Sequence, residues 1–196
     1  MKSTLHRREV VKALLSDRKE LLVVAGLGST SWDITAVGDA PLNFPLWGAM
    51  GNAAMIGLGL ALAQPARRVL VITGDGEMLM GLGSLATIGV QAPPNLSVVV
   101  IDNERYGETG MQATHTAEGV DLARVALACG FASAKRLHAA GQLAGLHRAI
   151  HRARGPHFAQ IKVVAEKLPL LLPPRDGGLL KSRFRKTLLG EAADLD

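Results

Sequence analysis

The chain has 196 residues, which is enough for one domain and a terminal extension but too few for two complete catalytic domains. Hydrophobic residues make up 48% of the chain and charged residues 20%, which excludes an intrinsically disordered protein. The formal net charge of +5 arises at the ends, because residues 1–20, 21–133 and 134–196 carry +3, −5 and +7. With only 4% aromatic residues, this pattern argues against a nucleic-acid-binding protein.

The N-terminal segment reads MKSTLHRREVVKALL and is charged and amphipathic. It has neither the apolar core nor the cleavage site of a secretory signal, so we expect a cytoplasmic protein. The longest nearly uncharged stretch, residues 46–63, contains four glycines and predicts a buried helix in preference to a membrane span, so no membrane association is expected. The single cysteine, Cys129, excludes an intrachain disulfide and is interpreted as a small core residue.

Apolar runs rich in β-branched residues predict the buried strands Leu21–Ala25, Val69–Thr73, Leu96–Ile101 and His157–Val164, with a further short strand at Phe131–Leu137. Helical patterns occupy Arg8–Leu15, Asn52–Gln64, Leu79–Val90, Asp121–Cys129, Gly141–Arg154 and Leu179–Leu189. Because the strands alternate with helices and have no polar face, we predict an α/β fold with three layers, α/β/α, around a doubly wound, mainly parallel sheet.

A composition break near the C-terminus, KLPLLLPPRDGG, indicates a proline-stiffened connector. We therefore predict one main domain over residues 1–166. Residues 167–196 are expected to form the connector and a basic helix that packs on this domain or on a partner.

Ligands of a doubly wound sheet bind beyond the carboxyl ends of its strands. At one such end, Gly74 and Gly76 let the backbone approach an anion such as a diphosphate, and a helix is expected a few residues later. Asp75 adds a carboxylate, and Asn103 adds a carboxamide oxygen at the end of the next strand. A parallel sheet could bring the two side chains together, and the acidic middle of the chain suits a cation, so this edge predicts a magnesium site.

Three histidines are candidates for a chemical role. His115 follows the third strand-end turn and could donate a proton or bind a substrate anion, or it could be a surface histidine. His147 and His151 lie one helical turn apart and could ligate zinc. No third ligand has a suitable spacing, so we interpret them as part of a solvated basic face.

GDG followed by Asn103, with 27 residues between Asp75 and Asn103, resembles the signature of thiamine-diphosphate-dependent enzymes, and the resemblance extends from about Leu21 to Val164. Its first segment is FPLWGAMGNAAMIGLGLALA. By this resemblance, Met50 would be the apolar wedge beneath a bent thiamine, and the Gly48 carbonyl would hold the aminopyrimidine. An ordinary core methionine is the alternative interpretation of Met50.

The second segment, VLVITGDGEMLMGLGSLATIG, begins the diphosphate site. The resemblance assigns Asp75 to the metal and the Gly76 and Glu77 amides, next to Gly74, to the diphosphate. Glu77 replaces the small residue that is common in the family, and we expect its side chain to point away from the phosphate.

The turn AGLGSTS would add hydroxyl groups to the diphosphate site, from Ser29, Thr30 or Ser31, and the sequence does not decide which. The same turn is an incomplete match to a dinucleotide-binding fingerprint, which we regard as a weak alternative.

The third segment, VVVIDNERYGETGMQATHT, would supply Asn103 and the Arg105 carbonyl as the remaining metal ligands, with Tyr106 near the cofactor. Its loop YGETGMQAT is similar to the loop of the phosphonopyruvate and sulfopyruvate decarboxylase group, although Glu108 and Met111 depart from that pattern.

In this family, a glutamate that activates the pyrimidine ring belongs to a separate domain, for which the chain has no room. The resemblance therefore implies the diphosphate-binding β subunit of a hetero-oligomeric decarboxylase that needs thiamine diphosphate, Mg²⁺ and an α subunit. An anionic 2-oxo acid such as sulfopyruvate or phosphonopyruvate is the expected substrate. A carboligase subunit similar to acetolactate synthase, or a non-catalytic cofactor-binding regulatory subunit, is the alternative.

Overall fold

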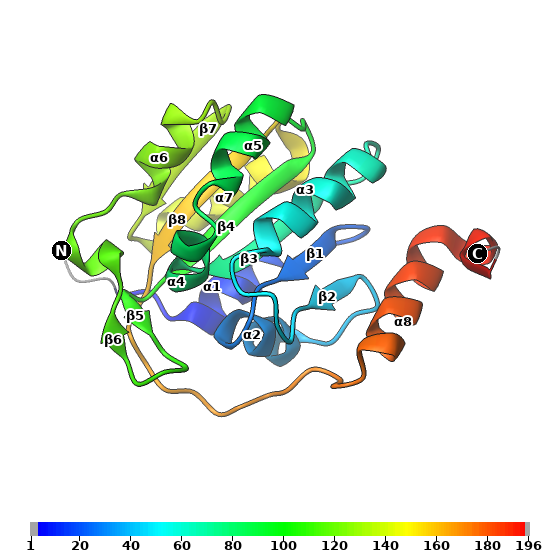
Figure 1. Cartoon of the computed structure of the whole chain (residues 1–196), viewed down its shortest axis with the longest axis horizontal. Helices are drawn as coiled ribbons and strands as arrows, with labels where there is room; N and C mark the ends of the chain where they lie inside the picture. The colour runs from blue at the N-terminus through cyan, green and yellow to red at the C-terminus, as the bar shows by residue number, and fades with distance from the viewer. Residues whose placement is uncertain (1–3, 195–196) are drawn as a thin grey trace.

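A six-stranded parallel sheet forms the centre of the computed structural model, which describes residues 4–194 (Figure 1). The strand order is β2-β1-β3-β4-β8-β7. These strands are β1 (Leu22–Ala25), β2 (Asn43–Pro45), β3 (Val69–Gly74), β4 (Leu96–Asp102), β7 (Ser133–Leu137) and β8 (His157–Lys162). Every pairing between neighbouring strands is parallel, as predicted.

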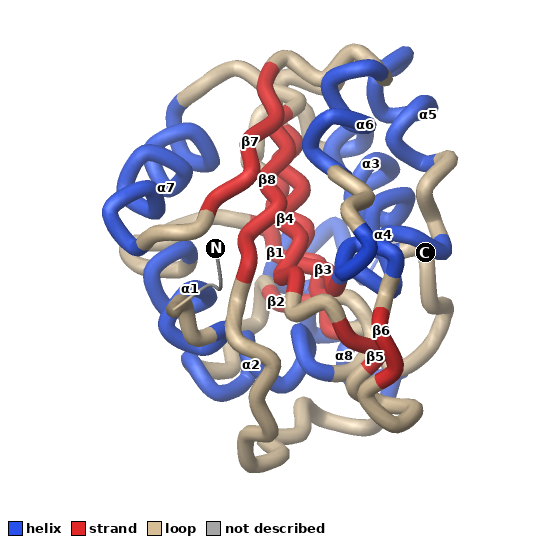
Figure 2. Tube along the Cα trace, turned by 90° about the vertical axis from the view of Figure 1, so that its left-hand side faces the viewer, coloured by secondary structure: helices blue, strands red, loops and turns tan. Residues whose placement is uncertain are grey.

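Helices cover both faces of the sheet, which explains why its central strands have no polar face (Figure 2). One face carries α1 (Arg7–Leu14), α2 (Ser29–Val37) and α7 (Leu143–Arg152), and the other carries α3 (Ala53–Ala63), α5 (Ser84–Gln91) and α6 (Leu122–Ala128). Along β1, Leu22 and Val24 belong to the core under α3, whereas Val23 and Ala25 belong to the core under α1. The predicted three-layer α/β/α fold is therefore confirmed.

The order of the strands changes direction at β1, which has β2 on one side and β3 on the other. Gly74 at the end of β3 pairs with Ile101 near the end of β4. The residues that follow these two strands therefore leave the sheet at the same edge. The short helix α4 (Asp75–Met80) and a small hairpin of β5 (Arg105–Tyr106) and β6 (Gln112–Ala113) lie at this edge (Figure 1).

The helix predicted over Leu79–Val90 is wrong at its start, because two shorter helices replace it. α4 begins at Asp75 itself, directly after β3, and α5 begins at Ser84. The break between them follows from a close approach of two backbones. A Cβ atom on Gly81 would collide with the carbonyl oxygen of Gly51, so the chain must turn there to accommodate the loop that precedes α3.

Two further elements, α2 and β2, were not predicted. The sequence of α2, STSWDITAV, mixes buried polar and apolar residues and has no clear apolar stripe. β2 has three residues, one of them Pro45, and lies at the sheet edge, where proline is tolerated. Neither element carries the periodicity on which sequence-based prediction depends.

The C-terminal helix α8 (Gly177–Leu189) packs on β2 through the rings of Phe184 and Phe44, whose centroids are 5.4 Å apart in an edge-to-face arrangement. The connector before it is also held, because Trp47 Nε1 donates to the Pro174 carbonyl over 2.8 Å. The division of the chain at residue 166 remains a proposal.

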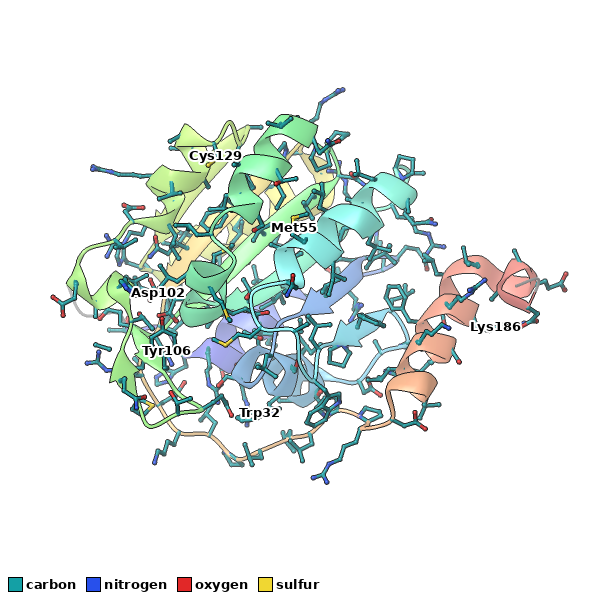
Figure 3. All side chains as sticks on the ribbon, in the orientation of Figure 1. Trp32, Met55, Asp102, Tyr106, Cys129 and Lys186 are labelled. Carbon is teal, nitrogen blue, oxygen red and sulfur yellow. The ribbon has the colours of Figure 1, made fainter. Side chains whose placement is uncertain are left out.

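No helix within residues 4–194 has the length and apolar character needed to cross a membrane. The stretch 46–63 instead contains the eleven-residue helix α3. Cys129 is half-buried and packs against the core beside α6 (Figure 3).

Candidate active site at the carboxyl ends of the central strands

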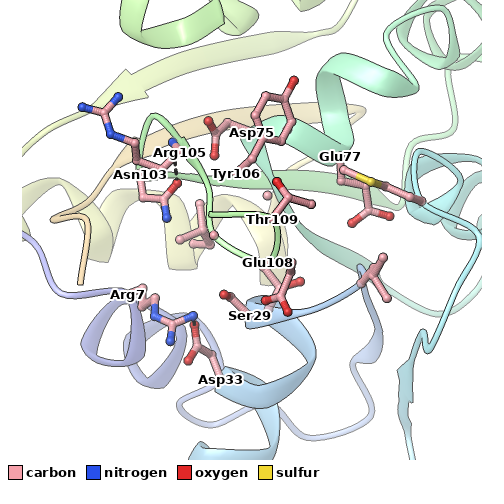
Figure 4. Close-up of a pocket in the computed structure, with 17 residues that line it drawn as sticks. Arg7, Ser29, Asp33, Asp75, Glu77, Asn103, Arg105, Tyr106, Glu108 and Thr109 are labelled. Carbon is pink, nitrogen blue, oxygen red and sulfur yellow. Dashed lines mark hydrogen bonds and ion pairs between the residues drawn. The ribbon is translucent and has the colours of Figure 1, made fainter. Parts of the chain in front are cut away.

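A cavity of about 200 Å³ opens at the carboxyl ends of β1, β3 and β4 (Figure 4). It brings together residues that are far apart in the sequence. Ten residues singled out from the sequence line it: Ser29, Thr30, Met50, Gly74, Asp75, Gly76, Glu77, Asn103, Arg105 and Tyr106. Three others do not line it: Ser31, Gly48 and His115.

The three hydroxyl groups after β1 differ in their availability. Thr30 Oγ1 and Ser31 Oγ both donate to the carbonyl of Gly26, over 2.8 and 2.7 Å. Ser29, the first residue of α2, lines the cavity, and its hydroxyl makes no hydrogen bond with other described residues. Of the three, Ser29 is therefore the hydroxyl that is free to bind a ligand.

Asp75 is almost completely buried, with 2% of its surface exposed. Its Oδ2 accepts hydrogen bonds from the hydroxyls of Thr114, at 2.5 Å, and Thr116, at 3.3 Å. Burial and the neighbouring carboxylate of Asp102 raise the pKa of Asp75 to about 6, although the two hydroxyls act in the opposite direction. A cation at this position would favour the ionised carboxylate, which suits a metal ligand.

A buried polar network continues from Asp75 toward β8. Thr116 also donates to Asp102 Oδ1 over 2.8 Å, and Gln160 donates to Asp102 Oδ2 over 2.5 Å. Lys162, which is 5% exposed, places its ammonium 2.8 Å from Asp102 Oδ2 and 2.5 Å from Glu104 Oε1. One lysine therefore joins the end of β4 to the turn that follows it.

That turn carries the other predicted metal ligands. Glu104 has φ +62°, a strained conformation for a residue with a side chain. Its N–H donates to Asp102 Oδ1 over 3.0 Å, and the N–H of Arg105 donates to Asn103 Oδ1 over 2.9 Å. The carboxamide oxygen of Asn103 retains a second lone pair, so it can still bind a cation.

Met50 reaches the cavity from a strained loop. The residues on both sides of it, Ala49 and Gly51, have φ values of +59° and +90°. Alanine rarely adopts this conformation, so the surrounding structure must enforce it. The loop therefore orients Met50 toward the cavity at a cost in backbone energy.

Glu77 ties the turns around the cavity together. Its Oε2 accepts a hydrogen bond from Thr73 Oγ1 over 2.8 Å, and a Cβ atom on Gly26 would collide with the same carboxylate. Burial raises the pKa of Glu77, while Thr73 and the N–H groups of Gly51, Ala53 and Leu27 oppose this shift. The side chain thus has neighbours from three separate loops.

The structure also identifies cavity residues that sequence reasoning missed, among them Arg7, Asp33, Glu108 and Thr109. Lys162, which lies beside the cavity network, gave one signal that could have been used, since it is a lysine in a strand that was predicted to be buried. His147 and His151 have no third ligand with which to bind zinc, because no group of three His, Cys, Asp or Glu residues in the described part of the chain could hold a metal. His147 bonds to the Ser16 carbonyl instead, at 2.8 Å.

Comparison with known proteins gives a consistent result. The family described as thiamine pyrophosphate enzyme, C-terminal TPP binding domain, matches residues 32–163. The sulfopyruvate decarboxylase subunit beta of Methanothermobacter thermautotrophicus is 36% identical over 190 residues, which cover 97% of this chain and 99% of that protein.

Longer proteins match over part of their length. The phosphonopyruvate decarboxylase of Streptomyces hygroscopicus is 40% identical over 156 residues, covering 78% of this chain but 38% of that protein. The crystal structure of benzoylformate decarboxylase from Polynucleobacter necessarius has the same fold, with a TM-score of 0.71 at 20% identity, covering 85% of this chain and 34% of that one.

Replacing Lys162 by methionine should lower the free energy of unfolding by about 3–5 kcal/mol, because the substitution leaves the buried carboxylate of Asp102 without its cation. Urea denaturation of both proteins measures the difference. Lys135→Met is the control, since Lys135 is exposed on the neighbouring strand β7. Equal losses in the two variants would show that the Lys162 ion pairs do not stabilise the fold.

Asp75→Asn should stabilise the metal-free protein at neutral pH. The pKa of Asp75 is raised in the fold, so the wild-type protein loses stability as the pH rises from about 4 to 6, and the neutral asparagine avoids this loss. The gain should approach about 2–3 kcal/mol above pH 6 and vanish near pH 4.

Thermal unfolding in EDTA across this pH range measures the gain of Asp75→Asn. If Asp75 is a metal ligand, as predicted, adding Mg²⁺ should reverse the order of stability, because the variant lacks the carboxylate. A variant that is less stable than wild type in EDTA at pH 8 would contradict the assigned burial penalty.

Proposed function

Because the chain belongs to the thiamine pyrophosphate enzymes, as the β subunit of a thiamine-diphosphate-dependent 2-oxo acid decarboxylase, we propose that it acts on a 2-oxo acid with an anionic substituent. Sulfopyruvate is the first choice. The observation that carries this choice is the match to a sulfopyruvate decarboxylase β subunit, which runs through nearly the full length of both chains. Phosphonopyruvate, which has the same shape and a similar charge, is the second choice.

The residues of the cavity fit a magnesium diphosphate. We propose that Asp75, Asn103 and the Arg105 carbonyl hold Mg²⁺, since carboxylate, carboxamide and carbonyl oxygens are the ligands that this cation prefers. The N–H groups of Gly76 and Glu77 would bind the diphosphate. These groups lie in one cavity, and their strand ends are adjacent in the sheet.

The remaining contacts to the diphosphate are proposed for Ser29, Thr30 and Tyr106, which line the same cavity. Ser29 needs no rearrangement to make its contact, whereas the hydroxyl of Thr30 would first have to leave the Gly26 carbonyl. Gly76 is required beside Tyr106, because a Cβ atom there would collide with the ring. When bound, thiamine diphosphate supplies the electron sink for the loss of carbon dioxide.

The chain would complete its site only with a partner. A cavity of about 200 Å³ is smaller than the roughly 300–1,000 Å³ of typical cofactor sites. The relative that matches end to end is itself named a β subunit, and the phosphonopyruvate decarboxylase that matches in part has a further 62% of its length unmatched. We propose that an α subunit supplies the remaining wall and the glutamate that activates the pyrimidine.

The side of the site that would face this partner carries exposed residues. Trp47, at 41% exposed, and Met80, at 68%, flank the loop of Met50. Gly48 and His115 are exposed as well, so roles for the Gly48 carbonyl and the His115 side chain require the assembled complex. We propose that this complex is located in the cytoplasm.

The central experiment is reconstitution with an α subunit that carries the pyrimidine-binding domain. We expect the pair, but neither chain alone, to release carbon dioxide from sulfopyruvate in the presence of thiamine diphosphate and Mg²⁺. Asn103→Ala should abolish Mg²⁺-dependent cofactor binding in the pair, as judged by calorimetry, while the fold survives. Full activity of the isolated chain would overturn the proposed partner, and a cofactor-binding pair without turnover would favour a regulatory role.

Met50→Ala separates two interpretations of this residue. If Met50 is the wedge that shapes the cofactor, the variant should lose turnover much more than cofactor affinity, because diphosphate anchoring is intact. If Met50 only packs, its truncation should cost about 2–5 kcal/mol of stability and leave the turnover of folded complexes nearly unchanged. Turnover, cofactor affinity and melting temperature of the reconstituted variant distinguish these results.

A further inference from the structure

Arg7 lies at one end of the cavity and has no role in the proposed cofactor site. Arg7, the first residue of α1, lines this end and is only 5% exposed. Its Nη1 lies 3.3 Å from Oδ2 of Asp33, whereas its Nε has no hydrogen-bond partner among the described residues. A buried donor that is left unpaired costs about 1–3 kcal/mol, so the absence of a partner needs an explanation.

The single carboxylate of Asp33 does not balance the charges of the two arginines that contact it. Asp33 is fully buried and contacts two arginines, because Arg8 Nε also donates to its Oδ1 over 3.1 Å. Arg8 does not line the cavity, and it also donates to the carbonyl of Pro169. One carboxylate cannot neutralise two guanidinium groups, so these three side chains together keep one positive charge, which the carboxylates of Glu108 and Glu166 approach.

A carboxylate from another part of the chain faces this charge. Glu108, at the tip of the β5–β6 hairpin, reaches the first turn of α2, and a Cβ atom on Gly28 would lie 2.9 Å from its Oε1. Partial burial raises the pKa of Glu108, and Arg7 opposes this shift. Figure 4 shows Glu108, Ser29 and Arg7 gathered at the same end of the cavity.

The start of α2 offers further donors to a negative group at this place. Gly28, with φ +76°, precedes the nine-residue helix and provides no side-chain cap, so the first N–H groups lack an intrahelical acceptor. The Ser29 hydroxyl is free beside them. The Glu108 carboxylate thus lies beside a buried guanidinium with an unpaired N–H and an uncapped helix start. These donors are the surroundings that a bound oxyanion requires.

Building on the proposed function, we propose that this end of the cavity is an oxyanion subsite, in which Arg7 binds a phosphate or sulfonate group and Glu108 occupies its place in the ligand-free protein. Asp33 holds the guanidinium in position, and the planar fork of arginine suits an oxyanion with several equivalent oxygens. Glu108 would repel such a group and must move away as it binds. Its loop, residues 107–110, is exposed, which makes this movement compatible with an intact sheet.

Two ligands of the reaction carry a suitable group: the distal phosphate of thiamine diphosphate and the sulfonate of sulfopyruvate. Arg7→Met in the complex with the α subunit tests both, with Arg8→Met as the matched control that contacts the same Asp33 from outside the cavity. Calorimetry would compare thiamine diphosphate with thiamine monophosphate. Decarboxylation assays would compare the KM for sulfopyruvate with that for pyruvate.

If the distal phosphate binds Arg7, Arg7→Met should weaken the binding of thiamine diphosphate by 10- to 100-fold and the binding of thiamine monophosphate by less than twofold. If the sulfonate binds Arg7, cofactor affinity should hold, and the KM should rise at least tenfold for sulfopyruvate but not for pyruvate. Arg8→Met should leave all four values within about twofold of wild type. Either pattern supports the subsite and identifies its ligand.

Glu108→Gln provides a second test in an exposed loop, where loss of the fold is not expected. The binding of the same oxyanion ligand should become about 3- to 10-fold tighter, and this gain in affinity should disappear when Arg7→Met is also present. The proposal is overturned if a folded Arg7→Met complex binds all four compounds as wild type does, if Arg8→Met has the same effect, or if Glu108→Gln weakens the oxyanion ligand. A wild-type complex that binds no thiamine diphosphate would instead count against the proposed function.

Discussion

The buried ion pair between Lys162 and Asp102 is the interaction on which the site depends. Asp102 lies between two of the proposed metal ligands: it approaches Asp75 through Thr116, and it accepts a hydrogen bond from the N–H of Glu104 in the turn that holds Asn103. Without the nearby ammonium, two buried carboxylates would face each other across these hydroxyls. The lysine on β8 therefore allows β3 and β4 to end in acidic residues side by side.

This arrangement also orients the proposed metal ligands in the absence of a metal. The carboxyl ends of β3 and β4 are aligned by the register of the sheet, and the hydroxyls of Thr114 and Thr116 orient the carboxylate of Asp75. Both threonines follow β6, so the hairpin that carries Tyr106 over the cavity also returns to hold the metal ligand. Side chains that are fixed in this way lose little conformational entropy on binding.

The sequence predicted the sheet well because its strands are buried on both faces and read as uninterrupted apolar runs. It also predicted the positions of Asp75 and Asn103, because strand ends of a parallel sheet meet at one edge. It could not predict the break between α4 and α5, since that break depends on the contact between Gly51 and Gly81. Arg7 was missed for a similar reason, because its neighbours come from distant segments. Lys162 and Glu108 do carry local signals, a lysine in a predicted strand and a departure from the loop pattern, but their partners also lie far away in the sequence.

The two regions of the cavity differ in how they are built. The end near Asp75 is fixed by the sheet register and by buried hydrogen bonds, whereas the tip of the hairpin is exposed and contacts the cavity through Gly107, Glu108 and Thr109. Substitutions in the tip can therefore accumulate without disturbing the core. Related decarboxylases could diverge in the acids that they accept by changing a few residues of one hairpin, while the strand ends that would anchor the cofactor stay the same.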